Sequence, residues 1–524
     1  MSTGYWGLFL HAHLPFVRHP EYEYFLEEHW LFEALAECYL PLLRRFYRLN
    51  SEGIPYRLTM SLTPTLASML TDPLLQDRFR KYLDRTMELA EKEITRTQTD
   101  GAMNRLARFY LDRLTVKRRF YQDTLHSDVL SGFRWLADTG NLEIITCGAT
   151  HGFLPLLSYH PPSVEAQVEV AVRTHRRLLG REPAGIMLPE CAYYQGLEEV
   201  VARYNLNFFI LDSHGLLYSR PRSLYGVFAP VFMPNGVAAF ARDHESSKQV
   251  WSSKEGYPGD PFYRDFYRDV GFDLDMQHVG PYVSPDGLRT FTGIKYHRIT
   301  GETDHKEPYD PEAALDRVRE HAANFVFNRE RQAEHLAGLM GKPPIIVSPY
   351  DAELYGHWWF EGPDFLEHVF RRMAPSLIRS VTLSGYLEEN PTHQVATPCA
   401  SSWGDKGYYE VWLNGANDWI WRYLHNAAIR MSERARKYPA PDPLRERILN
   451  QMARELLLAQ SSDWPFIMTM GTSVEYAERR FKQHIHRFNQ LDGILDEGWD
   501  EEKLRRIEDV DNLFPDIDYR IYAK

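Results

Sequence analysis

The chain has few cysteines and no surplus of positive charge. Its four cysteines are widely separated and form no CxxC pair: Cys38, Cys147, Cys191 and Cys399. This spacing excludes a secreted disulfide framework and indicates a reducing compartment, so we expect a cytoplasmic protein. The formal net charge of -12 argues against nucleic-acid binding, because no excess of Lys and Arg is available to neutralise phosphates.

Long apolar runs and common nucleotide-binding motifs are also missing. No stretch approaches the length of a membrane span, and no basic segment followed by an apolar one opens the sequence, so we expect neither a membrane partner nor a secretory leader. No GxGxxG opens a helix after the first expected strand, and no P-loop occurs. The 524 residues can hold two or three domains, or one large barrel with additions.

Aromatic residues, in contrast, are abundant. They make up 14% of the chain and include 12 Trp and 31 Tyr. Sugar rings stack on flat aromatic faces, although a large hydrophobic core also needs many such residues. The composition therefore suits a carbohydrate-binding protein without proving one.

Short apolar segments alternate with helical ones along the first 395 residues. We expect strands at 5–10, 56–61, 142–147, 185–188, 207–211, 237–240, 345–348 and 380–383. Most of them run directly into polar residues. This rhythm predicts an α/β fold, and the many polar strand ends favour a closed parallel barrel, whose strand tips share one mouth, over an open doubly wound sheet.

Two segments depart from this rhythm. Residues 72–136 are highly charged and nearly free of Gly and Pro, which predicts long helices in an insertion too long for an ordinary connection. After residue 396 a loop rich in Gly, Asn and Trp leads into a helical remainder. We therefore predict a barrel domain at 1–395, interrupted by the insertion at 72–136, and a C-terminal helical domain at 396–524.

Glu190 and Asp351 are the first candidates for a pair of catalytic carboxylates. Each follows an apolar strand and a proline, so each is expected to point into the barrel mouth. Two opposed carboxylates are the minimum for glycoside chemistry, in which one attacks or stabilises the anomeric carbon and the other protonates the leaving oxygen. Each acid alone would suit a helix cap or an ion pair. The pair together with the aromatic residues favours catalysis.

His11 and His13 lie on one face of the first strand, because side chains alternate along a strand. With His151 and Asp212, at the ends of later strands, they could hold a metal ion, as in barrel deacetylases. The same histidines could instead bind sugar hydroxyls or be satisfied inside the core.

Six tryptophans gather in two loop segments beside Gly and Asn. They are Trp358, Trp359, Trp403, Trp412, Trp419 and Trp421. Loop tryptophans of this kind often line a groove, although some must belong to the core. Asp463 interrupts the helical C-terminal region and is either a helix cap or a residue that reaches back to the groove.

Five ordered motifs make the chain resemble a known family. They are His-Ala-His-Leu-Pro at 11–15, Ala-Thr-His-Gly-Phe-Leu-Pro at 149–155, Leu-Pro-Glu-Cys-Ala-Tyr at 188–193, Ser-Pro-Tyr-Asp-Ala-Glu-Leu-Tyr-Gly-His-Trp-Trp at 348–359, and Ser-Trp-Gly at 402–404. Together they resemble the motifs of glycoside hydrolase family 57. The segments 249–252, 256–260 and 461–464 look typical of its α-1,4-glucan branching enzymes.

The resemblance implies a (β/α)7 barrel of distorted TIM type with an inserted helical domain, a C-terminal all-helical domain and no metal or other cofactor. It implies that Glu190 is the nucleophile and Asp351 the general acid/base, and that the substrate is an α-glucan acting as donor and acceptor. The residues that it places against the sugar or along the groove are His11, His13, Trp30, His151, Trp403, Trp412 and Asp463.

The expected activity is cleavage of α-1,4 linkages with retention and formation of α-1,6 branches in glycogen- or amylose-type glucans. The alternatives are an α-amylase or 4-α-glucanotransferase of the same family, a metal-dependent carbohydrate deacetylase, or a glucan-binding protein without activity. Branching enzymes of the family carry a mobile loop with a tyrosine between the third and fourth motifs. The corresponding residues 232–250 contain Phe232 and Phe240 but no tyrosine.

Overall fold

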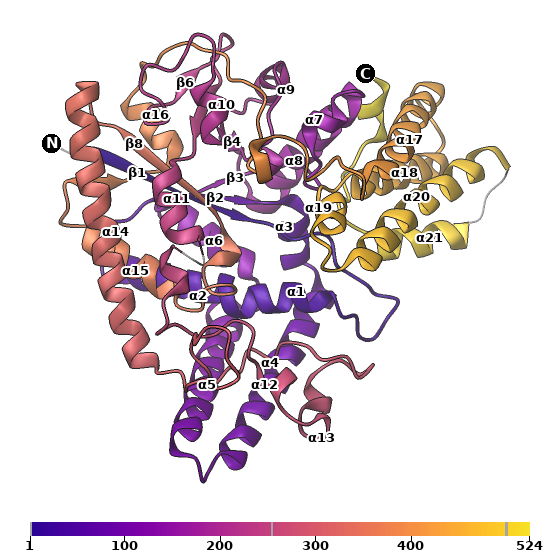
Figure 1. The fold of residues 1–524 in the computed structure, drawn as a ribbon. Coiled ribbons are helices and arrows are strands. Elements are labelled where there is room, and N and C mark those ends of the chain that lie inside the picture. The colour runs from indigo at the N-terminus through magenta and orange to yellow at the C-terminus, as the bar shows by residue number, and fades with distance from the viewer. Residues whose placement is uncertain (1–2, 253–254, 498–500) are drawn as a thin grey trace.

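The computed structural model describes residues 3–252, 255–497 and 501–524. Figure 1 shows a central group of strands surrounded by helices, a long helical hairpin that projects from it, and a cluster of C-terminal helices on one side. No helix within these described ranges is long and apolar enough to cross a membrane.

The strands form two sheets. The first has the order β3 (Leu142–Ile145), β2 (Leu58–Leu62), β1 (Gly4–Ala12) and β8 (Ile345–Asp351), all parallel. The second has the order β4 (Gly185–Ile186), β5 (Phe208–Leu211), β7 (Ala238–Ala241) and β6 (Val231–Phe232), with β6 antiparallel to β7.

Two backbone connections close these sheets into a barrel. Thr146 bridges Ile186 in parallel, and its carbonyl accepts a hydrogen bond of 2.9 Å from the amide of Met187, which joins β3 to β4. The amide of Asp243 donates to the carbonyl of Val347 at 2.8 Å, which joins the end of β7 to β8. The ring therefore runs β1, β2, β3, β4, β5, β7, β8, and the predicted (β/α)7 barrel is confirmed.

The strand expected at 380–383 is displaced. The structure has β9 at Ile378–Ser380, paired with Gly4–Trp6 at the start of β1, and helix α16 begins at Leu383. The apolar run there belongs partly to a helix start, where Thr382 caps the helix through the amide of Gly385.

Alternate residues of the barrel strands point inward and fill the interior. Phe9, Ile210, Phe240 and Val347 belong to one buried cluster to which four different strands contribute. Two residues further along each strand, on the same face, come His11, Asp212, Arg242 and Pro349. Asp351 follows two residues after Pro349, again on the same face. The inward face therefore changes from apolar to polar at the carboxyl end of the barrel.

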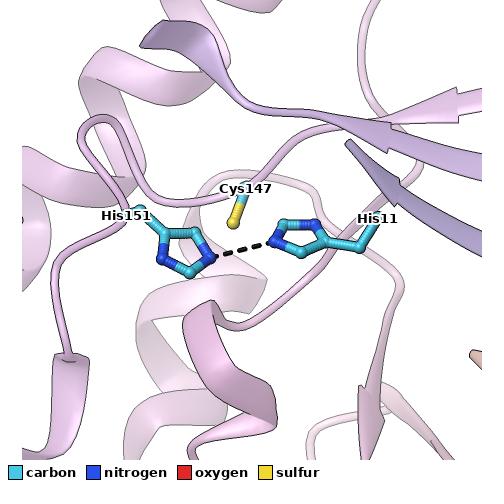
Figure 2. Close-up of side chains that lie close together, drawn as sticks. All are labelled: His11, Cys147 and His151. Carbon is cyan, nitrogen blue, oxygen red and sulfur yellow. Dashed lines mark hydrogen bonds between the residues drawn. The ribbon is translucent and has the colours of Figure 1, made fainter. Parts of the chain in front are cut away.

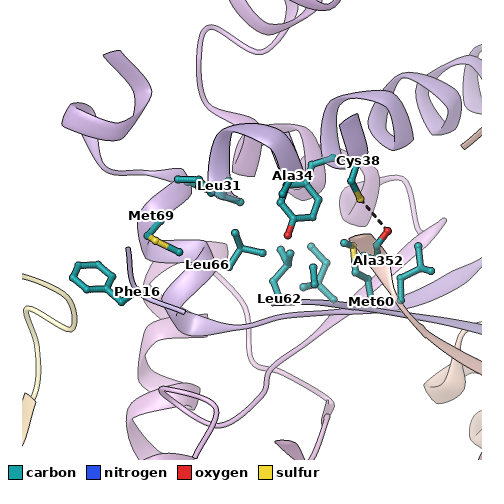
Figure 3. Close-up of a cluster of buried hydrophobic side chains, with 14 of the residues drawn as sticks. Phe16, Leu31, Ala34, Cys38, Met60, Leu62, Leu66, Met69 and Ala352 are labelled. Atoms are coloured by element: carbon teal, nitrogen blue, oxygen red, sulfur yellow. Dashed lines mark hydrogen bonds between the residues drawn. The ribbon is translucent and has the colours of Figure 1, made fainter. Parts of the chain in front are cut away.

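Helices cover the outside of the barrel and are bounded as follows: α1 (Glu28–Glu33), a π-helical segment (Ala34–Tyr39), α2 (Leu40–Ser51), α3 (Pro64–Leu70), α6 (Val129–Asp138), α8 (Pro161–Leu179), α9 (Leu197–Arg203), α10 (Ser213–Leu217), α11 (His244–Trp251), α14 (Pro311–Met340) and α15 (Gly362–Met373). Figure 3 shows buried side chains of α1, the π-helical segment and α3 packed together near the ends of β2 and β8. There the thiol of Cys38 donates to the carbonyl of Ala352 at 3.0 Å.

The helical hairpin consists of α4 (Pro73–Arg96) and α5 (Gly101–Arg119), whose first amides are capped by Asp72 and Asp100. It is the purple pair at the bottom of Figure 1. Helix α6, which ends the segment predicted as an insertion, packs against β3 and α2.

The C-terminal helices are α17 (Asp418–Lys437), α18 (Pro443–Ala459), α19 (Asp463–Met470), α20 (Val474–Glu497) and α21 (Glu501–Val510). Helices α18 and α20 pack along each other, and α19 packs on α20. In Figure 1 α19 is the C-terminal helix drawn nearest the barrel.

Gly356, which follows β8, is a position where the fold requires glycine. Its φ is +115°, and a Cβ added there would lie 1.9 Å from the carbonyl oxygen of Glu37. Gly356→Ala is therefore expected to lower the free energy of unfolding by about 3 kcal/mol, through strain and overpacking. Gly338→Ala is the control, because that glycine is exposed on α14 and an added Cβ would meet nothing within 4 Å. Equal unfolding temperatures for the two variants in calorimetry would contradict this expectation.

Candidate active site

A cavity of about 670 Å³ opens at the carboxyl ends of the barrel strands. The nine residues that the family resemblance places at the site all line this cavity: His11, His13, Trp30, His151, Glu190, Asp351, Trp403, Trp412 and Asp463. They come from segments up to 452 residues apart, counted from His11 to Asp463, so the fold and not the local sequence brings them together.

Glu190 sits in a short 3-10 turn directly after β4. Its φ is +63° and that of Cys191 is +50°, a backbone conformation that non-glycine residues seldom adopt. Its carboxylate accepts hydrogen bonds from Trp403 Nε1 at 2.8 Å and from Ser462 Oγ at 3.0 Å. Burial raises the pKa of Glu190, while these two donors favour its charged form. The turn and the donors together hold a carboxylate in one orientation.

Asp351 ends β8, where its backbone is in register with His11 of β1. Burial, together with the nearby charges of Glu353 and Glu190, raises the pKa of the Asp351 carboxyl to about 8. Asp351 is therefore protonated at neutral pH, whereas the hydrogen bonds from Trp403 and Ser462 favour the ionised form of Glu190. Two carboxyl groups whose environments separate their protonation states can serve as acid and nucleophile in one reaction.

A chain of hydrogen bonds runs from β2 through the histidines to Glu190. His11 Nδ1 contacts Ser61 Oγ at 2.6 Å, and His151 Nδ1 contacts Ser462 Oγ at 2.7 Å. Between them, the Nε2 atoms of His11 and His151 are 3.0 Å apart (Figure 2). Ser462 donates its proton to Glu190, so His151 Nδ1 donates to Ser462 and His11 Nε2 donates to His151. Burial lowers the pKa of both histidines, so both imidazoles are neutral.

His13 forms an ion pair instead. Its Nε2 lies 3.0 Å from Asp463 Oδ1, and its Nδ1 lies 3.2 Å from Thr63 Oγ1. Burial alone would lower the pKa of His13, but the carboxylates of Asp463, Glu190 and Glu353 together outweigh burial and raise it. This pair joins the end of β1 to the start of α19. Ser462 and Asp463 therefore bring the C-terminal helices into the site.

The six loop tryptophans divide into two groups. Trp358, Trp403 and Trp412 line the cavity, and Trp412 stacks on Phe153 with ring centroids 4.4 Å apart. The other three pack away from it: Trp359 and Trp421 are buried in the core, and Trp419 packs edge-on against Phe481.

Asp212 does not join the histidines. Its carboxylate is paired with Arg242, and its Oδ1 lies 3.2 Å from His214 Nδ1. The expected set of His11, His13, His151 and Asp212 is therefore not assembled as one group of metal ligands. The sulfur of Cys147 lies beside His11 and His151 instead.

Comparison with known proteins agrees with this geometry. Residues 7–399 match the model described as glycosyl hydrolase family 57, and residues 423–522 match that described as 1,4-alpha-glucan branching enzyme, C-terminal. The chain belongs to glycoside hydrolase family 57.

Several known proteins resemble the chain over nearly its full length. A 1,4-alpha-glucan branching enzyme of Thermococcus kodakarensis is 33% identical over 98% of this chain and 77% of its own length. The structure of a GH57-type branching enzyme from Pyrococcus horikoshii has a TM-score of 0.90 at 35% identity, covering 100% of this chain and 97% of that one. The structure titled as the novel alpha-amylase AmyC from Thermotoga maritima has a TM-score of 0.94 at 46% identity, covering 100% and 99%.

Several residues that line this family 57 site were not predicted from the sequence, among them Glu33, Arg242 and Trp251. Arg242 continues the inward face of β7 two residues after Phe240, so strand alternation could have identified it. Glu33 lies just before the π-helical segment, and no sequence pattern marked it. Trp251 ends α11, which occupies part of the 232–250 segment.

The raised pKa of Asp351 predicts how the activity of this family 57 enzyme depends on pH. The acid must be protonated, so kcat/KM is expected to fall as pH rises through about 8. Glu353→Gln removes the neighbouring charge that raises this pKa, so the fall should occur at lower pH in that variant. Rates measured on a soluble maltooligosaccharide from pH 5 to about pH 10 test this expectation. An unmoved alkaline limb would exclude Asp351 as the group that causes it.

Proposed function

We propose that this chain is a 1,4-α-glucan branching enzyme. The observation that carries the proposal is the contribution of the C-terminal region to the site. The segment that matches the branching-enzyme C-terminal model supplies Ser462, which donates to Glu190, and Asp463, which pairs with His13. A region typical of branching enzymes thus reaches both the carboxylate and the histidines of the barrel.

In the proposed reaction Glu190 attacks the anomeric carbon of an α-1,4-linked glucan while Asp351 protonates the departing oxygen. A covalent glucosyl–enzyme forms on Glu190. Asp351, now ionised, then takes the proton from the 6-hydroxyl of an acceptor chain, and that oxygen displaces Glu190 to leave an α-1,6 branch with retained configuration. The donors Trp403 and Ser462 stabilise the Glu190 carboxylate when it departs.

The remaining predicted residues bind the glucan in this proposal. His11, His13 and His151 line the cavity beside Glu190, where they would exchange some of their present hydrogen bonds for bonds to sugar hydroxyls. Trp30, Trp403 and Trp412 line its walls, and their rings suit stacking against sugars. The donor and acceptor partners are α-glucans such as amylose and glycogen. The free thiols of the chain suit the cytoplasm, where we place the enzyme.

An α-amylase or 4-α-glucanotransferase remains the second candidate, because the Thermotoga maritima structure at 46% identity is titled an alpha-amylase. Incubation with amylose separates the two. Branching should lower the iodine colour with little gain of reducing ends, and a debranching enzyme should then release short chains. Rising reducing ends with no debranchable product would instead identify a hydrolase.

A further inference from the structure

Three buried side chains that could ligate a metal ion meet beneath the floor of the cavity. His11 Nε2, His151 Nε2 and the sulfur of Cys147 all lie within 4.8 Å of one another. Figure 2 shows the sulfur directed toward the gap between the two imidazoles. Cys147 follows β3 on the inward face and does not line the cavity, whereas both histidines do. An ion can therefore approach from the cavity and meet the sulfur behind the rings.

The surroundings of this trio suit a metal ion that prefers nitrogen and sulfur. Each histidine points Nε2 at the common centre and anchors Nδ1 on a hydroxyl, His11 on Ser61 and His151 on Ser462. A metal-bound imidazole normally has its second nitrogen held by such a hydrogen bond. Ser462 in turn contacts the Glu190 carboxylate at 3.0 Å. Two imidazoles and one thiolate with an open fourth position form a zinc-binding set.

We propose that His11, His151 and Cys147 form a binding site for Zn²⁺ and similar soft divalent ions, and that occupancy inhibits the enzyme. The ion replaces the proton shared by the two Nε2 atoms. That proton moves to His11 Nδ1, where it is donated to Ser61, so His11 changes tautomer and keeps its charge. Cys147 loses its thiol proton to solvent, and one S–Zn and two N–Zn bonds form. One proton leaves for each ion bound, and no redox partner is needed.

Inhibition follows because the ion binds two imidazoles that line the glucan cavity and breaks the hydrogen bond between them. His11 and His151 cannot contact sugar hydroxyls while they ligate a metal, and His151 is linked through Ser462 to Glu190. Zn²⁺ should therefore compete with the glucan, and chelation should restore activity. A metal-dependent deacetylase would respond in the opposite way, by losing activity on chelation.

Cobalt substitution of the whole protein tests the site without relying on activity. Co²⁺ bound as proposed should give a thiolate-to-cobalt charge-transfer band and intense visible bands of a tetrahedral ion. Cys147→Ser should abolish the charge-transfer band and raise the inhibition constant for Zn²⁺ on the order of 100-fold, while uninhibited activity stays near that of the unmodified protein. Cys399→Ser is the matched control and should change neither. An unchanged band in Cys147→Ser would overturn the proposal.

X-ray absorption of the zinc-loaded, unmutated protein covers the case in which Cys147→Ser does not fold. One sulfur neighbour at about 2.3 Å and nitrogen neighbours at about 2.0 Å are expected. A zinc environment of oxygen and nitrogen only would refute the site. It would place the ion elsewhere, for example at Glu455, His484 and Asp511, a second buried group that contains no sulfur and in which Asp511 already pairs with Arg487.

Discussion

Glu190→Gln is expected to lower the rate of branching on the order of 10⁴-fold or more, because the covalent intermediate can no longer form. The amide nearly matches the carboxylate in size, and its oxygen can still accept a hydrogen bond from Trp403 or Ser462. The thermal unfolding temperature should therefore change little. Branching rates on amylose, measured beside a calorimetric scan, separate lost chemistry from lost structure. Retained branching would remove Glu190 as the nucleophile.

Glu190→Ala allows the role to be assigned by stereochemistry. The shortened side chain leaves room for azide, and Asp351 can still protonate the leaving oxygen. Azide should restore glycosidic cleavage and give a β-glucosyl azide, because a single displacement inverts the α-linked centre. Proton NMR of the product identifies the anomer. An α-glucosyl azide would show that another residue forms the intermediate.

Asp351→Ala is expected to have the second large effect, a loss on the order of 10³- to 10⁴-fold on glucans, because the leaving oxygen departs unprotonated. The loss should be much smaller with an α-maltosyl fluoride donor, since fluoride leaves without a proton. The glucosyl–enzyme then accumulates, and azide should convert it to the α-azide, the opposite anomer from that of Glu190→Ala. The fall of kcat/KM near pH 8 should also vanish.

Glu353→Gln is the matched control for Asp351→Ala, because the two acids are two residues apart and both line the cavity. At a pH below its own, lowered alkaline fall, where Asp351 is protonated, Glu353→Gln should keep most of the activity on glucans. Equal losses in both variants, with no rescue by the fluoride donor, would mean that Asp351 supports the structure and does not transfer the proton.

The sequence was informative about the barrel because its strands are buried on both faces and end in polar residues. That pattern located Glu190, Asp351, His11 and His13, and the structure places all four on one cavity, while their roles remain to be tested. The strand pattern could not reveal how the strands close into a barrel. The join between β3 and β4 depends on Thr146 outside any strand, and β4 has only two residues.

Contacts between distant segments were beyond sequence patterns. Trp358 and Trp359 are neighbours in the sequence, yet Trp358 is exposed at the cavity and Trp359 is buried. Trp359 is buried because it packs on Phe365 of the following helix, α15, a contact that the local sequence does not reveal. Asp212 looked like a ligand because it ends a strand, but its carboxylate is neutralised by Arg242 from the next parallel strand. Such pairings depend on the order of strands in space.

The reach of Ser462 and Asp463 into the barrel has a consequence for the order in which the enzyme becomes competent during synthesis. A nascent chain that has completed the barrel already contains Glu190 and Asp351 together with His11, His13 and His151. It still lacks both donors to Glu190, Trp403 and Ser462, and the Asp463 partner of His13. Translation beyond residue 463 supplies all three, so a chain that stops short of it carries Glu190 and Asp351 with Glu190 and His13 each missing a partner.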